Sequence, residues 1–245
     1  MVARRRGAKP DAQMTVVEHL AELRRRLMIS VVALLVGGVI AYVFSLDIIA
    51  FLIRYYERAT DGRHDALIFL GPADAFVTRL KIATYGAVVL AMPVWLYQLW
   101  RFVTPGLNPN ERRYALPFVL SAIALFITGA VFALFMIQPA LDFLLGVAGS
   151  DLEPTLSADR YLSMVSLMIL AFGLAFEFPV VLVFLLLAGV LSTGQLSRWR
   201  RPVILAVVVF SAFITPADPY SLVFMAVPMY LFYEVSIIIG KLIKR

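Results

Sequence analysis

Four carboxylates occupy the positions in this chain where an acidic side chain could do chemistry. Glu22 lies just before the first apolar stretch, and Glu111 lies between the second and the third. Glu177 lies deep within the fourth stretch, and Asp218 follows the fifth in a short turn. Because an ionised carboxylate costs about 3 kcal/mol at the centre of a bilayer, such groups are kept where they bind cations, carry protons or hold helices together.

Residues 14–27 predict an amphipathic helix at the cytoplasmic membrane interface. Apolar side chains recur on one side at helical spacing, while Glu18 and Glu22 share the other side. As a structural residue, Glu22 is explained by an intrahelical pair with Arg25 or Arg26. The functional alternative is an anionic patch that receives a cationic ligand from the cytoplasm.

Glu111 stands at a predicted helix start. Asn108, followed by Pro109 and by a carboxylate three residues on, is typical of the first turn of a helix, where the carboxylate meets the positive end of the helix dipole. Capping therefore explains Glu111 without a ligand. Phe102, at the membrane boundary before this loop, is typical of interfacial aromatic residues.

Glu177 belongs to the apolar run 161–191, and we expect it to face protein or water. It could join helices as a polar staple, relay protons, or dock a polar residue of another helix. Glu234 lies nearer the end of the last apolar stretch and is more easily hydrated. Asp218 follows a Thr-Pro-Ala sequence, where a turn role is sufficient.

Composition places the chain in a membrane and excludes several other classes. Hydrophobic residues make up 62% of the 245 residues and charged residues 16%, with a mean hydropathy of +0.88, so the apolar surplus has to face lipid. The net charge of +6 is dispersed among loops, which does not indicate nucleic-acid binding. There is no cysteine, and the two histidines are far apart in the sequence, so we expect no metal site. Because no phosphate-binding loop, nucleophile elbow or metalloprotease signature occurs, we expect no cofactor and no enzymatic activity.

Six apolar stretches predict an all-α integral membrane protein with six transmembrane helices. They cover residues 27–46, 75–100, 115–143, 161–191, 203–214 and 221–240. A core of about 30 Å needs roughly 20 residues, so the fifth stretch, whose length is about 18 Å, is a short span. Prolines within and beside the spans predict bent helices in a concave bundle. No internal repeat of the transporter kind is found.

The distribution of basic residues predicts that both termini are cytoplasmic. Of the 22 lysines and arginines, 16 fall before the first stretch, in alternate loops and at the tail, while the opposite side holds six of them and ten of the 16 acids. No small-residue cleavage site precedes a mature domain, so the first stretch is expected to be an uncleaved span. We divide the chain into a basic tail, 1–13, a six-span domain, 14–240, and a short basic tail, 241–245.

Several linked motifs resemble the TatC family, the multi-span receptor subunits of the twin-arginine protein translocase. The motifs lie at residues 18–27, 93–107 with 111–113, 171–179, 215–218 and 226–230. The resemblance implies six helices in a concave, glove-like bundle in the bacterial cytoplasmic membrane. It also implies recognition of signal peptides that carry paired arginines, and export of folded proteins driven by the proton-motive force.

The resemblance implies a role for each residue of the cytoplasmic site. Glu22 and Glu111 become the anionic pair that contacts the guanidinium groups of the signal peptide. Guanidinium pairs with carboxylate through a fork that lysine cannot reproduce, which fits selectivity for arginine. Phe102, Pro105 and Leu107 would shape the site around these acids.

The resemblance also implies partner subunits and an oligomeric assembly. Glu177 becomes the intramembrane glutamate where single-span subunits of the TatA and TatB type dock, and Asp218 belongs to an outer loop important for assembly. Leu222 stands where the family often has a polar residue such as glutamine, so the resemblance does not extend to a partner contact through that side chain. Two rival hypotheses are a secondary transporter with Glu177 as its proton carrier and a membrane-embedded enzyme. The first should show paired repeats and several converging ionisable groups, and the second needs a catalytic cluster.

Overall fold

The computed structural model describes residues 16–60, 67–103, 115–147 and 156–243. The helices are α1 (Val16–Val43), α2 (Ser45–Ala59), α3 (Asp74–Val103), α4 (Ala115–Gly146), α5 (Ala158–Phe176), α6 (Phe178–Leu187), α7 (Thr193–Arg198), α8 (Arg200–Ile214) and α9 (Pro219–Ile243). Within the described residues there is no β-strand, and one isolated parallel bridge joins Ile68 to Ser157. The all-α class predicted from the sequence is confirmed.

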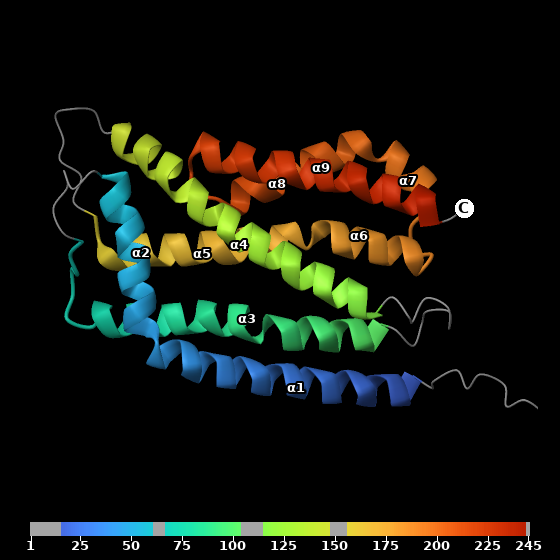
Figure 1. Ribbon diagram of the computed structural model, residues 1–245, viewed down its shortest axis with the longest axis horizontal. Coiled ribbons are helices and arrows are strands. Elements are labelled where there is room, and N and C mark those ends of the chain that lie inside the picture. The colour runs from blue at the N-terminus through green and yellow to red at the C-terminus, as the bar shows by residue number, and fades with distance from the viewer. Residues whose placement is uncertain (1–15, 61–66, 104–114, 148–155, 244–245) are drawn as a thin grey trace, which may run out of the picture.

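Most of the helices run along one common axis, and α2 crosses them at one end (Figure 1). In that view α1 lies along the lower edge beside α3, α5 and α6 follow one another through the middle, and α8 and α9 form the upper edge. The first turn of α1 and the last turn of α9 lie at the end opposite α2. We call this the terminal end of the bundle, and the other the α2 end.

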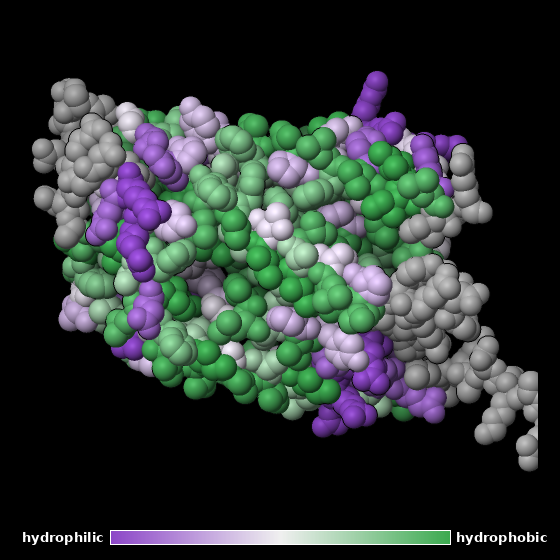
Figure 2. Space-filling model, in the orientation of Figure 1, coloured by the Kyte–Doolittle hydropathy of each residue, from purple (hydrophilic) through white to green (hydrophobic). Residues whose placement is uncertain are grey.

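Five helical stretches are long and apolar enough to cross a membrane: Val17–Val43, Asp74–Phe102, Leu116–Gly146, Ala158–Leu187 and Pro219–Leu242. Hydrophobic residues dominate the face seen in Figure 2, and hydrophilic residues gather toward its two ends. The remaining predicted span is α8, which has 15 residues and a length of about 22 Å. It is short, as the sequence indicates, and the count of six spans stays a prediction because it depends on α8.

The predicted interfacial helix at residues 14–27 is not a separate element. Helix α1 runs without a break from Val16 to Val43. Neither glycine nor proline occurs between residues 16 and 36, so nothing in the sequence ends the helix where the apolar stretch begins. Glu22 therefore lies on the first turns of a long apolar helix.

The fourth predicted span, 161–191, consists of two helices instead of one. Helix α5 ends at Phe176, α6 begins at Phe178, and Glu177 lies at the junction. Pro179 in the first turn of α6 has no N–H group and cannot continue the hydrogen-bond ladder of α5. Glu177, the one acidic residue of the stretch 161–191, therefore lies at the break.

Close packing fixes α5 against α4. A Cβ atom added to Gly129 on α4 would lie 2.5 Å from the carbonyl oxygen of Phe172 on α5, and one added to Gly173 would lie 2.8 Å from the ring of Phe126. Only glycine permits so short a distance between two helices. Phe126 and Phe172 are themselves fully buried, so these contacts position the α5–α6 junction in the middle of the bundle.

Candidate functional site

Glu22 lies in a polar pocket where α1 and α3 meet at the terminal end. Its Oε1 atom accepts hydrogen bonds from Nε of Arg26, at 3.1 Å, and from Nη2 of the same guanidinium. Arg26 Nη1 donates across to Oε1 of Gln98 on α3, at 3.3 Å. The predicted intrahelical pair is therefore present with Arg26, and Gln98 is a member of the site that the sequence did not reveal.

The second carboxylate oxygen of Glu22 is available. Glu22 Oε2 is buried and has no hydrogen-bond partner among the described residues. The pocket has a volume of about 120 Å³ and is lined by Glu22, Arg25, Arg26, Ile29, Gln98 and Arg101. A buried acceptor without a donor costs about 1–3 kcal/mol, so this oxygen is suited to accept a hydrogen bond from a ligand.

Phe102 lies at the same end as Glu22, as expected from its position after α3's apolar run. Its ring stacks on that of His19, with 4.5 Å between ring centroids and an interplanar angle of 21°. His19 precedes Glu22 by three residues on α1, so both side chains belong to one region of the helix surface. No local pattern predicts His19 as part of the site, because its contact joins the start of α1 to the end of α3, which are far apart in the sequence.

Glu111, Pro105 and Leu107 lie outside the described residues. Their predicted places in the signal-peptide site therefore stay predictions. Helix α3 ends at Val103 and α4 begins at Ala115, and both of these helix ends lie at the terminal end, where α1 begins (Figure 1).

Glu177 lies at the α5–α6 junction, far from either end of the bundle. The residue is 6% exposed, and neither carboxylate oxygen has a hydrogen-bond partner among the described residues. The polar-staple interpretation therefore finds no partner helix in this part of the chain. A carboxyl group in this position needs a donor from outside the described structure, or must be protonated.

A cavity of about 460 Å³ lies beside Glu177, between α3, α4 and the α5–α6 pair. Its lining includes Trp95, Leu99, Phe118 and Val181. Glu177 is the one ionisable residue among its described lining residues. The arrangement is an apolar recess with a single acceptor group, which suits an apolar ligand that carries a hydrogen-bond donor.

Asp218 has the turn role predicted for it, at the α2 end of the bundle. Its Oδ1 atom accepts a hydrogen bond from the backbone N–H of Ser221, at 2.6 Å, which caps the start of α9. The residue is 3% exposed, and Oδ2 has no hydrogen-bond partner among the described residues. The α8–α9 turn lies at the end opposite the Glu22 pocket (Figure 1), so these two acids do not form one site.

Glu234 is fully paired. Arg200 Nε donates to Glu234 Oε1 and Arg200 Nη2 to Oε2, both at 2.8 Å, and the Tyr230 hydroxyl donates to Oε1 at 2.9 Å. This bidentate pair ties the first turn of the short α8 to α9. It was not evident in the sequence, where Arg200 is one of several arginines in a basic loop.

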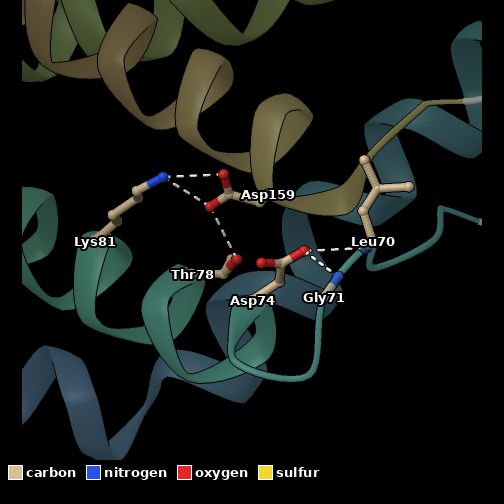
Figure 3. Close-up of polar contacts among 6 residues, drawn as sticks. All are labelled: Leu70, Gly71, Asp74, Thr78, Lys81 and Asp159. Carbon is tan, nitrogen blue, oxygen red and sulfur yellow. Dashed lines mark hydrogen bonds and ion pairs between the residues drawn. The ribbon is translucent and has the colours of Figure 1, made fainter.

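A second polar network ties α3 to α5 at the α2 end (Figure 3). Lys81 Nζ donates to both carboxylate oxygens of Asp159, at 2.8 and 2.9 Å, and the Thr78 hydroxyl donates to Oδ1 at 3.1 Å. Asp74 Oδ2 accepts from the backbone N–H groups of Leu70, at 3.0 Å, and Gly71, at 2.7 Å. The bonds to Asp159 fix the spacing of α3 and α5, which form two walls of the cavity beside Glu177, and the bonds to Asp74 cap the start of α3.

These features define the class of the protein: a multi-span helical membrane protein in which Glu22 and Glu177 line pockets and keep carboxylate oxygens without a partner among the described residues. Among the described residues, no three His, Cys, Asp or Glu side chains come together in a way that could hold a metal ion. The pockets offer hydrogen-bond acceptors for a cationic or donor-bearing ligand.

The chain is similar to known proteins of one family. A family model described as Sec-independent protein translocase protein (TatC) matches residues 18–228. The Sec-independent protein translocase protein TatC of Frankia casuarinae is 44% identical over 253 residues, which cover 99% of this chain and 70% of that protein. Its counterpart in Aquifex aeolicus is 41% identical and covers 95% of this chain and 97% of that one.

Solved structures agree with the sequence relatives. The crystal structure of the twin arginine translocase receptor TatC superimposes with a TM-score of 0.81 at 41% identity, covering 93% of this chain and all of the other. A second crystal structure of that receptor, in DDM, gives a TM-score of 0.81 at 40% identity, with 91% and 99% covered. This chain belongs to the TatC family, whose members are protein translocase components and not enzymes.

Proposed function

We propose that this chain is the signal-peptide receptor and core subunit of a twin-arginine translocase, which exports folded proteins across the bacterial cytoplasmic membrane with the proton-motive force. The observation that carries the proposal is the unpaired, buried Oε2 atom of Glu22 in the polar pocket at the terminal end. The relatives are translocase proteins, and the superimposed structures are of a twin arginine translocase receptor.

In this proposal Glu22 receives one guanidinium group of the signal peptide. Arg26 holds Oε1 and leaves Oε2 for the ligand. A planar guanidinium group carries five N–H donors, so it can donate to Oε2 and to a second acceptor at the same time, whereas an ammonium group cannot match that geometry. Paired arginines are therefore bound in preference to paired lysines.

A second carboxylate is needed, and we assign that role to Glu111. The described lining of the pocket holds one carboxylate, Glu22, against the three guanidinium groups of Arg25, Arg26 and Arg101. A ligand with two positive charges is repelled by this surplus unless another anion joins the site. Phe102, stacked on His19 one helical turn before Glu22, would border the bound peptide together with Pro105 and Leu107.

We propose that the terminal end faces the cytoplasm. Both ends of the described chain lie there (Figure 1), and 16 of the 22 basic residues fall on that side of the sequence pattern. Helix α8 then crosses the membrane as a short sixth span. Helix α8 is shorter than the hydrocarbon core, and its ion pair with Glu234 and its packing on α9 stabilise it in the membrane.

We propose that Glu177 docks a single-span partner helix of the TatA or TatB type. The cavity beside Glu177, of about 460 Å³, has an apolar lining from α3, α4 and the α5–α6 pair, which suits contact with an apolar helix. Both carboxylate oxygens lack a donor among the described residues, so the partner is expected to bring one. Asp218, at the other end, would support assembly through the α8–α9 turn.

The experiment compares peptide binding by wild type, Glu22→Gln, Glu111→Gln and the double variant. The ligands are one signal peptide with paired arginines and the same peptide with paired lysines. We expect each single variant to weaken binding of the arginine peptide and the double variant to abolish the preference for arginine. Undiminished binding by the double variant refutes the receptor site. Export of a folded reporter, with and without its arginine pair, then tests the role in translocation.

A further inference from the structure

Arg79 is a cationic side chain that the proposed function does not use. It lies on α3 near the α2 end, where Nε donates to the Ser45 hydroxyl at 2.9 Å and the guanidinium carbon lies 4.8 Å from the centre of the Tyr42 ring. These two contacts hold the guanidinium plane in place. Among the described residues neither Nη atom has a hydrogen-bond acceptor, and no carboxylate forms an ion pair with Arg79.

The surroundings of Arg79 are those of a group in contact with lipid. Phe44 is 55% exposed, Leu46 61%, Phe76 60% and Leu80 51%, and these residues flank Ser45 and Arg79 in the sequence. A guanidinium group among lipid-facing side chains retains donors that must meet water or an anion. Near the end of a span, the anion available in a membrane is the phosphate of a phospholipid.

An apolar groove begins one helical turn further along α3. It has a volume of about 220 Å³, and its lining includes Ala41, Ile48, Phe51, Leu52, Ile82 and Gly86. One wall comes from α2, which begins at Ser45, the residue whose hydroxyl accepts the hydrogen bond from Arg79. The groove and Arg79 therefore lie next to each other, because α2 and α3 contribute to both.

The lining of the groove and the charge beside it favour a lipid as the occupant. The groove has a volume of about 220 Å³ and an almost entirely apolar lining, which suits a hydrocarbon chain. Arg79, one turn away, supplies the positive charge that an anionic headgroup needs. The nearly all-carbon lining offers such a chain dispersion contacts and no hydrogen bond.

We propose that Arg79, Ser45 and Tyr42 form a binding site for an anionic phospholipid in the leaflet at the α2 end. The Nη atoms of Arg79 donate to the headgroup phosphate, and one acyl chain lies in the groove along α3. The lipid would stabilise the contact of α1 with α2 and α3 at this end of the bundle.

Native mass spectrometry of the purified full chain in detergent tests the site. Long-chain phosphatidylglycerol is titrated into wild type, Arg79→Gln and Arg58→Gln. Arg58 is the matched control, because it is an exposed arginine on α2 that also lies over a tyrosine ring, that of Tyr55, at 5.8 Å. We expect about tenfold weaker binding for Arg79→Gln, the loss of one charge-assisted contact, and no change for Arg58→Gln. Equal affinities in all three proteins, or equal losses in both variants, overturn the proposal.

A series of ligands bound to the wild-type protein tests the lipid site even if Arg79→Gln does not fold. The series contains long-chain phosphatidylcholine, short-chain phosphatidylglycerol and inorganic phosphate. We expect each to bind more weakly than long-chain phosphatidylglycerol. Equal binding of phosphatidylcholine refutes the role of the headgroup charge, and equal binding of the short-chain lipid or of phosphate refutes the role of the groove. The measurement involves neither signal peptide nor export, so its outcome is independent of the receptor function.

Discussion

Replacing Glu177 by leucine is expected to stabilise the isolated protein while weakening its association with a single-span partner. Glu177 is 6% exposed, and both of its oxygens lack a hydrogen-bond partner among the described residues. Leucine has a similar volume and no polar atom to desolvate, so the exchange should leave little cavity or strain. A group retained at a cost to the fold is expected to serve binding.

The magnitude follows from the unsatisfied carboxyl group. A buried polar group without a partner costs about 1–3 kcal/mol, and an acid at the centre of a span costs about 3 kcal/mol on insertion scales. We therefore expect the free energy of unfolding to rise by about 1–3 kcal/mol. For a chain of this length 1 kcal/mol shifts the unfolding midpoint by roughly 2–4 °C, so the midpoint of Glu177→Leu should rise by roughly 2–12 °C.

Thermal unfolding in detergent and coprecipitation with a tagged single-span subunit measure the two effects. Asp159→Leu is the control, because Asp159 receives bonds from Lys81 and Thr78 and its loss should lower the midpoint. Glu177→Ala should reduce partner association more than it reduces signal-peptide binding. A lower midpoint for Glu177→Leu would show that the carboxyl group has a stabilising partner, and the reverse order of binding losses for Glu177→Ala would remove the docking role.

Three further predictions concern the pocket, the short helix and the packing of α4. Arg26→Gln removes the internal guanidinium from the Glu22 pocket and should tighten binding of a twin-arginine peptide by about threefold to tenfold, measured by fluorescence anisotropy; weaker binding would mean that Arg26 positions the acid instead of competing for it. Arg200→Gln should increase hydrogen exchange in α8 only modestly, because the pair with Glu234 is partly exposed, and the exchanged pair Arg200→Glu with Glu234→Arg should restore protection if the ion pair is the cause. Gly129→Ala should destabilise the fold by about 1–3 kcal/mol through overpacking, whereas Gly146→Ala, whose added Cβ meets no atom within 4 Å, should not; equal effects in thermal unfolding would contradict the packing argument.

The sequence was sufficient for the features that depend on local spacing. Apolar stretches had to become helices because no other structure satisfies the backbone of a single segment in lipid, and five of them satisfy the length and composition of a span. The pair of Glu22 with Arg26 could be predicted because residues four apart lie together on a helix. Pro179 indicated a bend, whereas the structure has a break there between α5 and α6; Pro93, Pro139 and Pro228 lie within unbroken helices.

Contacts between distant segments could not be predicted in this way. Lys81 meets Asp159 across 78 positions of sequence, and Arg26 meets Gln98 across 72. Such pairs depend on which helices are neighbours and on how each helix is rotated about its own axis. The hydropathy of the sequence gives information on neither. The same reason explains why His19 was missed, since its stacking on Phe102 exists only once α1 lies along α3.

The hydrogen bonds of each carboxylate separate structural acids from candidate binding groups. In Asp159 and Glu234 both carboxylate oxygens accept hydrogen bonds from a basic side chain of a neighbouring helix. These two acids therefore hold helices together. Glu22 and Asp218 each have one bonded oxygen and one buried oxygen without a partner among the described residues, which fits positions that are fixed by the fold and still able to bind. Glu177 has neither oxygen bonded within the described chain, so the fold gains nothing from its charge. A buried acid that makes no bond among the described residues fits the docking role that we propose for Glu177.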